Sequence, residues 1–459
     1  MCLSNFDKVK IVTKGEKMSV QSKGKEMYDF ANKIFPYFRS LTGDGVRQTL
    51  SDIDEFISQD NGPHLNIYEV KSGTKAFDWT IPKEWKIREA YIEDEEGNHI
   101  IDIKNNNLHV LGYSTPVDRW VDLDELKNYI YTQPDQPDYI PYVTSYYKER
   151  YGFCMSENMK SSLKPGKYHM FIDSELFDGV LNYADVVLKG ESDKEILFST
   201  YVCHPSMANN ECSGPTVQAE LIRYVASLKN RRYTYRFVFD PETIGAITYM
   251  SQFNRIESMK KNVVAGFVLS CVGDDRAYGL VETKYSNTLA DKVLNNVLKY
   301  KTNDTYRRCS FLQRGSEEKE YGGPNCELPV VAFFRSKYGE YSEYHTSADN
   351  MLLVSPEGFQ GSYDVLTNVI NNLENNFYYK ITTFGNPQLG PRGLYPSVSQ
   401  KGIYDEVTVM MNFIAYADGR NDLIDISNII GVPVSKLIEV KDKLVRFDLL
   451  SVNECAIGE

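Results

Sequence analysis

Two histidines and a glutamate follow apolar segments of this chain, in positions where their side chains could bind a metal ion or activate water. His204 follows the apolar run 195–202, and Glu242 lies just beyond the similar run 233–240. His345 lies in a polar loop after a third run, 328–334. These runs predict buried strands, and ligands bind at the carboxyl ends of strands in open parallel sheets. We therefore expect the three side chains to meet at one edge of a sheet.

Each residue also has a plainer interpretation. Asp240 has the position of a helix cap, since a helix is predicted to begin near Ile244. Glu242 is expected to be too deep for a solvated surface residue, which favours a paired or catalytic carboxylate. A single loop histidine is usually a surface residue. The nearby Asp349, which could orient the imidazole of His345, favours a metal ligand instead.

The elements that position these residues alternate between strand and helix. Strands are predicted over 195–202, 233–240, 263–272 and 328–334, and helices after Pro215 and over 244–254, 286–302 and 355–377. Residues 22–60 also have helical spacing of apolar side chains. Unbroken apolar strands between helices indicate a three-layer α/β domain whose mixed, mainly parallel sheet is buried on both faces.

Two further regions have a different texture. Short alternating runs separated by Gly, Asn and Pro turns over 66–165 predict a β-rich inserted lobe. After a Gly/Pro-rich linker, helices are predicted over 403–417, 422–430 and 433–447, with the spacing of a winged helix-turn-helix. We therefore predict an α/β domain built from 20–65 and 166–385, a lobe over 66–165 and a C-terminal module over 390–459.

Charge and composition narrow the class of partner. The net charge is −12, and residues 402–459 hold five basic and ten acidic residues, a balance of −5. Because nucleic-acid binding needs a concentrated basic face, we expect no nucleic-acid partner. There is no run of 18 apolar residues, the first 20 residues lack the apolar segment of a secretory signal, and the eight cysteines form no CxxC pair. We expect a cytoplasmic protein with reduced thiols that does not span a membrane and could form a homo-oligomer.

Four short motifs give the chain a family resemblance. They are Cys203-His204-Pro205, Ser213-Gly214-Pro215, the Pro-Glu-Thr-Ile-Gly segment 241–245 and the Glu-Tyr-His-Thr-Ser-Ala-Asp segment 343–349. Together they resemble an aminopeptidase-like family associated with polysaccharide biosynthesis, which is related to the bacterial leucine aminopeptidases. The resemblance covers nearly the whole chain. It implies a zinc-exopeptidase fold of the phosphorylase/hydrolase-like type, an inserted lobe and a C-terminal winged helix.

The resemblance also implies that His204 and His345 are zinc ligands and that Glu242 is the general base. Three carboxylates of the related two-zinc enzymes are replaced here, by Asn210, Thr243 and Ser270. Since two close cations need carboxylates to offset their repulsion, we expect one zinc ion.

We predict a ligand set of His204, Glu211 and His345 with an open position for water, and Asn210 as a neighbour of the ligands. Asp274 or Asp275 could replace Glu211 as the third ligand. The zinc ion would lower the pKa of water, Glu242 would take the proton, and Tyr344 or Tyr341 would stabilise the oxyanion.

The expected substrate is a small peptide or an aminoacyl or N-acyl compound, and the end that is recognised stays open. Glu317, Glu318 and Glu343 could bind an α-ammonium group, whereas Arg335, Arg314 and Arg276 could bind a carboxylate.

Three other functions compete with a zinc hydrolase. The chain could be an inactive, aminopeptidase-fold scaffold in polysaccharide biosynthesis, as the three replaced carboxylates suggest. It could be a regulator that binds DNA through its C-terminal helices, although their negative charge disfavours this. A hydrolase that uses Ser213 or Cys203 as its nucleophile is disfavoured because no Gly-x-Ser-x-Gly elbow surrounds either residue.

Overall fold

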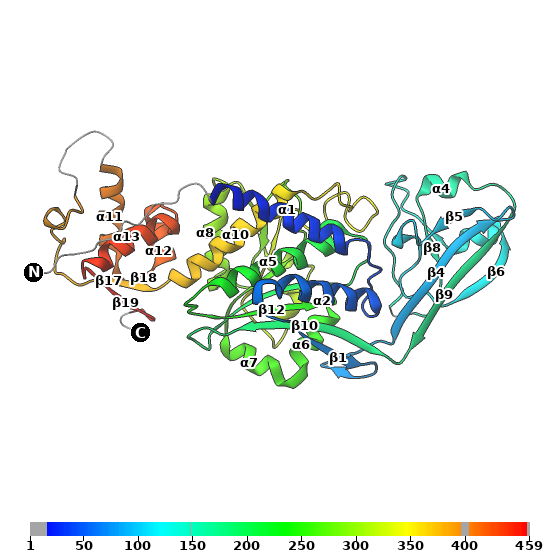
Figure 1. The fold of residues 1–459 in the computed structure, drawn as a ribbon, viewed down its shortest axis with the longest axis horizontal. Helices are drawn as coiled ribbons and strands as arrows, with labels where there is room; N and C mark the ends of the chain where they lie inside the picture. The colour runs from blue at the N-terminus through cyan, green and yellow to red at the C-terminus, as the bar shows by residue number, and fades with distance from the viewer. Residues whose placement is uncertain (1–15, 147, 396–403, 457–459) are drawn as a thin grey trace, which may run out of the picture.

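The protein has three parts in a row, with the α/β domain between the lobe and the C-terminal module (Figure 1). The structure is a computed structural model that describes residues 16–146, 148–395 and 404–456. Most of the N-terminal leader therefore lies outside the described residues, as does part of the linker before the C-terminal helices. In the described part of the chain, no helix has both the length and the apolar character needed to cross a membrane.

The central sheet has eight strands in the order β1-β10-β12-β11-β13-β16-β14-β15. The four strands β12, β11, β13 and β16 are parallel to one another, whereas β1 and β10 are antiparallel to their neighbours. This confirms a mixed sheet with a parallel centre. The strands are β1 (Asn66–Lys71), β10 (Val180–Leu188), β11 (Glu195–Tyr201), β12 (Thr234–Asp240), β13 (Val263–Leu269), β14 (Gly279–Val281), β15 (Arg307–Cys309) and β16 (Val330–Phe334).

Helices cover both faces of this sheet, as the unbroken apolar strands predict. Figure 1 shows α1, α2, α5, α8 and α10 on one face and α6 and α7 on the other. Successive apolar residues of a strand therefore point to opposite faces of the sheet and pack into two separate hydrophobic cores. The helices are α1 (Glu16–Ile34), α2 (Asp44–Ile57), α5 (Ser213–Ser227), α6 (Ile244–Ser251), α7 (Arg255–Asn262), α8 (Leu289–Lys301), α9 (Glu318–Tyr321) and α10 (Pro356–Asn375).

The inserted lobe is built on a four-stranded antiparallel sheet with the order β5-β4-β9-β6. Its elements are β4 (Glu84–Asp94), β5 (His99–Asp102), β6 (Val117–Asp122), α3 (Leu123–Leu126), β7 (Ile130–Tyr131), β8 (Phe153–Cys154), α4 (Glu157–Ser162) and β9 (Lys167–Phe177). The hairpin of β2 (Lys75–Ala76) and β3 (Trp79–Thr80) packs instead against α6 of the central domain. The predicted boundaries, 66 and 165, are wrong in detail. Strand β1 pairs with β10 of the central sheet, and β9 pairs with β4 and β6 of the lobe. Alternation in the sequence identifies a strand but not the sheet that it joins.

The C-terminal module contains three helices and a small sheet, as a winged helix-turn-helix requires. Its elements are β17 (Tyr378–Ile381), α11 (Tyr404–Tyr416), β18 (Asp418–Asp422), α12 (Leu423–Ile430), α13 (Val434–Arg446) and β19 (Leu450–Asn453), with strand order β18-β17-β19. Because β17 pairs with β18 and β19, the module begins before the predicted residue 390.

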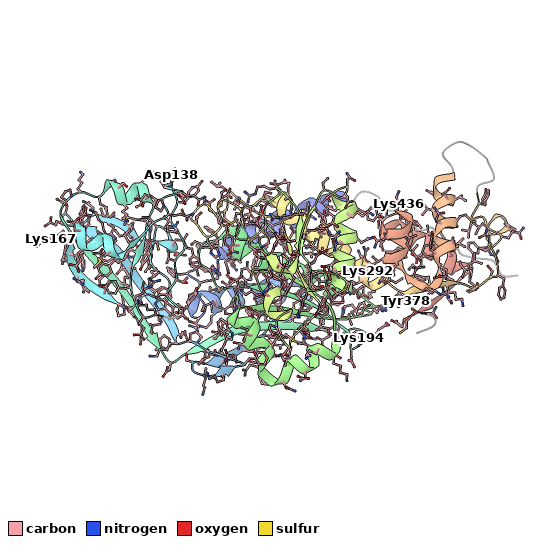
Figure 2. All side chains as sticks on the ribbon, turned by 180° about the vertical axis from the view of Figure 1, so that it is seen from behind. Asp138, Lys167, Lys194, Lys292, Tyr378 and Lys436 are labelled. Carbon is pink, nitrogen blue, oxygen red and sulfur yellow. The ribbon has the colours of Figure 1, made fainter. Side chains whose placement is uncertain are left out.

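The C-terminal module docks on α8 of the central domain. Nζ of Lys292 lies 2.6 Å from carboxylate oxygens of both Asp422 and Asp425, and Asn296 donates to Ser427. Figure 2 labels Lys292 near this junction, Tyr378 and Lys436 in the module, and Asp138 and Lys167 in the lobe at the opposite end.

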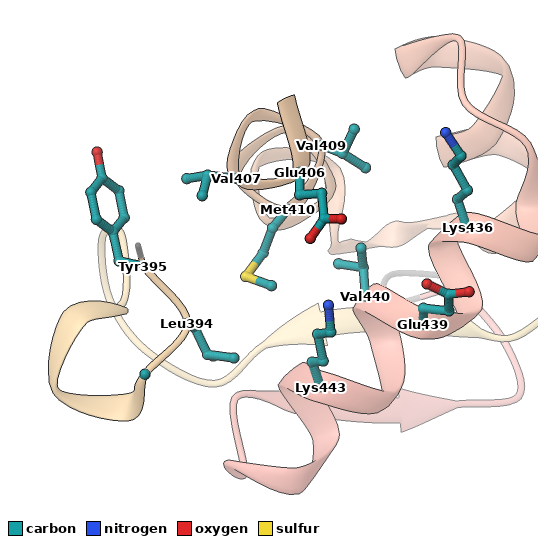
Figure 3. A pocket seen from close by; sticks show the side chains of 11 residues that line it. Leu394, Tyr395, Glu406, Val407, Val409, Met410, Lys436, Glu439, Val440 and Lys443 are labelled. Atoms are coloured by element: carbon teal, nitrogen blue, oxygen red, sulfur yellow. The ribbon is translucent and has the colours of Figure 1, made fainter. Parts of the chain in front are cut away.

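An open pocket of about 460 Å³ lies between α11, α13 and residues 393–395 (Figure 3). Apolar side chains such as Met410 of α11 and Val440 of α13 line it. The charged lining residues are two lysines and two glutamates: Lys436, Lys443, Glu406 and Glu439. This mixed lining does not form the concentrated basic surface that nucleic acid needs.

Close packing at Gly214 brings the start of α5 against the two strands that lead to the site. A Cβ atom at this position would lie 2.1 Å from Oγ1 of Thr200 and 2.7 Å from the carbonyl oxygen of Leu269. No side chain fits there without moving the helix or the strand backbone.

We expect Gly214→Ala to lower the free energy of unfolding by about 1–3 kcal/mol, because it overpacks this contact. Urea unfolding followed by circular dichroism measures the change. Gly390→Ala is the matched control, since a Cβ there meets no atom within 4 Å. Equal stability of the two variants would contradict the packing argument.

Candidate functional site

His204 lies just beyond the end of β11 and is almost fully buried. Its Nδ1 contacts the carboxylate of Glu211 and lies 3.0 Å from Sγ of Cys203. The other carboxylate oxygen of Glu211 accepts a hydrogen bond of 2.7 Å from the backbone N–H of Cys203. Burial lowers the pKa of His204, but Glu211 outweighs it and raises that pKa above the ordinary value. The ring is therefore held firmly on its Nδ1 side.

The other ring nitrogen of His204 faces Glu242. Nε2 lies 3.8 Å from Oε2 of Glu242, in the turn that follows β12. Burial raises the pKa of the Glu242 carboxyl, although His204 and Lys319 lower it in part. A carboxylate with a raised pKa beside an imidazole is suited to taking a proton from water near neutral pH.

His345 supplies the second imidazole, from the loop between β16 and α10. The two imidazole ring centres lie 5.1 Å apart. Burial, with a smaller contribution from His204, lowers the pKa of His345 well below its ordinary value, so the ring is neutral. Its Nε2 is buried and has no hydrogen-bond partner among the described residues. A buried polar nitrogen without a partner is costly, and binding to a metal ion would remove that cost.

The separation of the two imidazoles suits a shared zinc ion. Two imidazoles bound to one tetrahedral zinc, with Zn–N bonds of about 2.0–2.1 Å, have ring centres roughly 5 Å apart. The distance of 5.1 Å between the rings of His204 and His345 agrees with this. The two side chains thus lie side by side, while their role as zinc ligands stays a prediction.

Glu211 is buried beside His204, but the structure leaves two roles open for it. Ligand atoms of Cys203, His204 and Glu211 all lie within 4.8 Å of one another, so Glu211 could bind an ion on the Nδ1 side. Both of its oxygens already contact neighbours, the Cys203 N–H and the His204 ring. That arrangement is typical of a carboxylate that orients a metal-binding histidine through its second nitrogen. The prediction that Glu211 is the third ligand stays a prediction.

Neutral side chains occupy the three positions at which the family resemblance implied replaced carboxylates, and a lysine lies beside one of them. Asn210 donates a hydrogen bond of 2.9 Å to the hydroxyl of Tyr201, which also lies 2.5 Å from Oγ of Ser270. Nζ of Lys319 donates to Oγ1 of Thr243 over 3.0 Å. The positive charge of Lys319 would repel a second cation, and the neutral groups would bind it only weakly. Both effects favour a single ion.

Asp349 is part of the site but does not touch His345 in the way that we predicted. Its carboxylate accepts hydrogen bonds from the backbone N–H groups of Asn209 and Asn210, at 2.6 and 3.1 Å. The hydroxyl of Tyr341 donates to it over 2.9 Å. Asp349 therefore anchors the turn that carries Glu211. Tyr344 stacks flat on His345, with ring centres 3.8 Å apart.

The predicted substrate-binding charges have partners inside the protein. Glu317 accepts a hydrogen bond from Ser199, and Glu318 accepts one from the hydroxyl of Tyr338. Arg335 donates to the carbonyl oxygens of Ala277 and Gly358. All three charged side chains are buried, so the structure gives each of them an internal role, and Tyr341 likewise is occupied by Asp349. Their assignment as substrate-binding groups remains a prediction.

Sequence reasoning missed three members of the site. Cys203, which we considered as a disfavoured nucleophile, has its sulfur in the group of donor atoms around His204. Lys319, which stands in a run of charged residues, approaches Thr243. Tyr142 of the lobe packs against both imidazoles. Only Cys203 carried a signal, since it adjoins His204.

Comparison with known proteins identifies the relatives of the two main parts. A sequence-family model described as "Domain of unknown function (DUF4910)" matches residues 28–376, and a winged helix-turn-helix model matches residues 376–452. A protein of Clostridium acetobutylicum, described as a polysaccharide biosynthesis protein with an aminopeptidase-like domain, is 41% identical over 432 residues. That alignment covers 94% of this chain and 96% of the relative.

Solved structures show the same fold. A crystal structure described as a peptidase from Clostridium acetobutylicum has a TM-score of 0.85 and 39% identity, covering 95% of this chain and 98% of that one. A zinc aminopeptidase from Bacillus subtilis has a TM-score of 0.55 at 12% identity, covering 77% of this chain and 95% of its own. A peptidase M28 precursor from Shewanella amazonensis has a TM-score of 0.51 at 11% identity, over 77% and 94% of the two chains. The α/β domain thus has the M28 aminopeptidase fold.

We expect Asp349→Asn to lower the free energy of unfolding by about 1–3 kcal/mol, because an amide group cannot accept from two backbone N–H groups and a hydroxyl as a carboxylate does. Urea unfolding measures the change. Asp364→Asn provides the control, since Asp364 is partly exposed and pairs with Lys301 on the surface. If the two variants lost the same stability, Asp349 would not anchor the turn.

Proposed function

We propose that this chain, which belongs to the DUF4910 family and has the M28 aminopeptidase fold, is a zinc-dependent hydrolase that cleaves an amide bond at one end of a small substrate. The observation that carries the proposal is the position of His345, a half-buried residue whose Nε2 atom is fully buried. Its Nε2 lacks a hydrogen-bond partner among the described residues, and its ring centre lies 5.1 Å from that of His204.

We assign the ligands as His204 and His345, with Glu211 either as the third ligand or as the group that holds His204 through Nδ1. A zinc ion bound there would polarise the scissile carbonyl and lower the pKa of water. The neutral state of His345 suits this role, because only an imidazole with a free lone pair binds a metal ion.

Glu242 is the proposed general base. Its carboxylate lies 3.8 Å from Nε2 of His204, and its side chain keeps 18% exposure, so water can reach it. Glu242 would take a proton from the attacking water and pass it to the leaving amine.

Tyr344 is the proposed donor to the oxyanion. Burial, reinforced by Glu242, raises the pKa of its hydroxyl, so that the group keeps its proton and can donate a hydrogen bond.

The substrate that this proposal favours is a small peptide or an aminoacyl or N-acyl compound. The fold of zinc aminopeptidases supports a peptide, and the description of the Clostridium acetobutylicum relative supports an N-acylated amino sugar. A panel of aminoacyl, dipeptide and N-acyl amino-sugar amides, tested with zinc-loaded protein, separates these classes.

We expect Glu242→Gln to keep about one zinc per chain and to lower kcat by roughly 10²–10⁴-fold, because the substitution removes the base but leaves both imidazoles. Zinc content by atomic absorption and turnover of the best substrate of the panel are the two measurements. Glu220→Gln is the matched control, since Glu220 is a buried glutamate that pairs with Lys23 and Arg223, away from the site.

Two results would contradict the proposal. Wild-type protein purified without chelator could contain less than about 0.2 zinc per chain, a content far below the single ion of a catalytic site. That result would favour a non-catalytic scaffold, as the replaced carboxylates also suggest. Alternatively, Glu242→Gln could retain full turnover, which would exclude Glu242 as the base.

A further inference from the structure

A segment of the inserted lobe reaches across to the loop that carries His345. This segment, residues 136–146, is called the strap below. The backbone N–H of Tyr142 donates to the carbonyl oxygen of His345 over 2.9 Å, and the N–H of Ser347 donates to the carbonyl oxygen of Ile140 over 2.9 Å. Pro141 and Thr346 form an isolated antiparallel bridge. The strap and the loop therefore join like two short strands.

Both ends of this junction are anchored. Toward the α/β domain, Nε2 of Gln136 donates to the carbonyl oxygen of Ser342 over 2.7 Å. Toward the lobe, the N–H of Gly112 donates to the carbonyl oxygen of Val143, and the N–H of Ser145 donates back to Gly112, each over 2.9 Å. The lobe thus fixes the position of the strap. The strap in turn restricts the movement of the loop that carries His345.

The side chain of Tyr142 packs against both candidate zinc ligands. Its ring centre lies 4.8 Å from that of His204 and 5.2 Å from that of His345, where the planes meet at 88°. The Tyr142 hydroxyl lies 2.8 Å from the hydroxyl of Tyr146 and so is occupied within the lobe. The two imidazoles therefore face an apolar ring surface. A large rigid ring in this position limits how far the imidazoles can rotate.

The backbone of His345 needs such support. Its φ of +55° lies in the left-handed region, which is unfavourable for a residue with a side chain. A conformation of this kind costs roughly 1–3 kcal/mol and persists only where its surroundings fix it. The hydrogen bond from Tyr142 to the His345 carbonyl and the stack of Tyr344 on the ring are contacts that fix it here.

From these contacts we infer that Tyr142 is a positioning residue of the metal site and that the inserted lobe is an integral part of that site. The inference rests on the proposed zinc function. Tyr142 holds the two imidazoles at the separation that one ion requires, and it closes the side of the site that the lobe covers. Substrate then approaches from the side of Glu242, whose side chain keeps partial exposure.

The test is the zinc affinity of Tyr142 variants, measured by competition with a chromophoric chelator. We expect Tyr142→Ala to weaken zinc binding by about 10–100-fold, the usual effect of removing a group that orients metal ligands. Tyr142→Phe keeps the ring and the backbone hydrogen bond, so its affinity should stay within about threefold of wild type. Tyr146→Phe is the matched control, since it breaks the same hydrogen bond between the two hydroxyls but alters a ring that packs on Tyr113 of the lobe.

Circular dichroism and thermal unfolding establish that each variant is folded. If Tyr142→Ala does not fold, Gln136→Ala decides, because it removes only the anchor of the strap on Ser342 and should still weaken zinc binding several-fold. Wild-type affinity in a folded Tyr142→Ala protein, or in Gln136→Ala when the alanine variant is unfolded, would overturn the inference while leaving the zinc proposal intact. Failure of the wild-type protein to bind zinc would instead overturn the proposed function, and the inference with it.

Discussion

Two neighbouring imidazoles, one buried and one half-buried, are the constraint on which the site depends. A buried imidazole nitrogen without a partner costs free energy, and Nε2 of His345 is such a nitrogen. The ring centre of His345 lies 5.1 Å from the ring centre of His204. Glu211 and Cys203 fix one nitrogen of His204, which leaves the second directed towards Glu242. A cation shared by the two rings would give the unpartnered Nε2 of His345 a partner, with Glu211 behind His204 and Glu242 in front of it.

The central sheet makes this arrangement possible. Strands β11 and β12 are parallel neighbours, with Tyr201 paired to Asp240, so the residues that follow them emerge side by side at one edge. The loop after β16 brings His345 to the same edge. The close packing of Gly214 sets α5 against β11 and β13, and the lobe then closes over the edge through Tyr142. Elements that are far apart in the sequence thus share one small volume.

Much of this could be predicted from the sequence, since the dominant signal was local. The apolar runs at 195–202 and 233–240 and the residues just after them gave both the parallel strands and the position of His204 and Glu242. Contacts between residues far apart in the chain could not be predicted in this way. We predicted Glu317, Glu318 and Arg335 as substrate-binding groups from their charge alone. Their buried partners, such as Ser199 and Ala277, lie far away in the chain and could not be identified from the sequence. Tyr142 was missed for the same reason, since no local pattern links a proline-rich loop of the lobe to His345.

Anomalous diffraction at the zinc absorption edge, from crystals grown with zinc, tests the central claim most directly. The account requires one strong peak that lies about 2.1 Å from a ring nitrogen of His204 and also about 2.1 Å from a ring nitrogen of His345. Absence of a peak at this edge of the sheet, or a peak bound by only one of the two imidazoles, would contradict it.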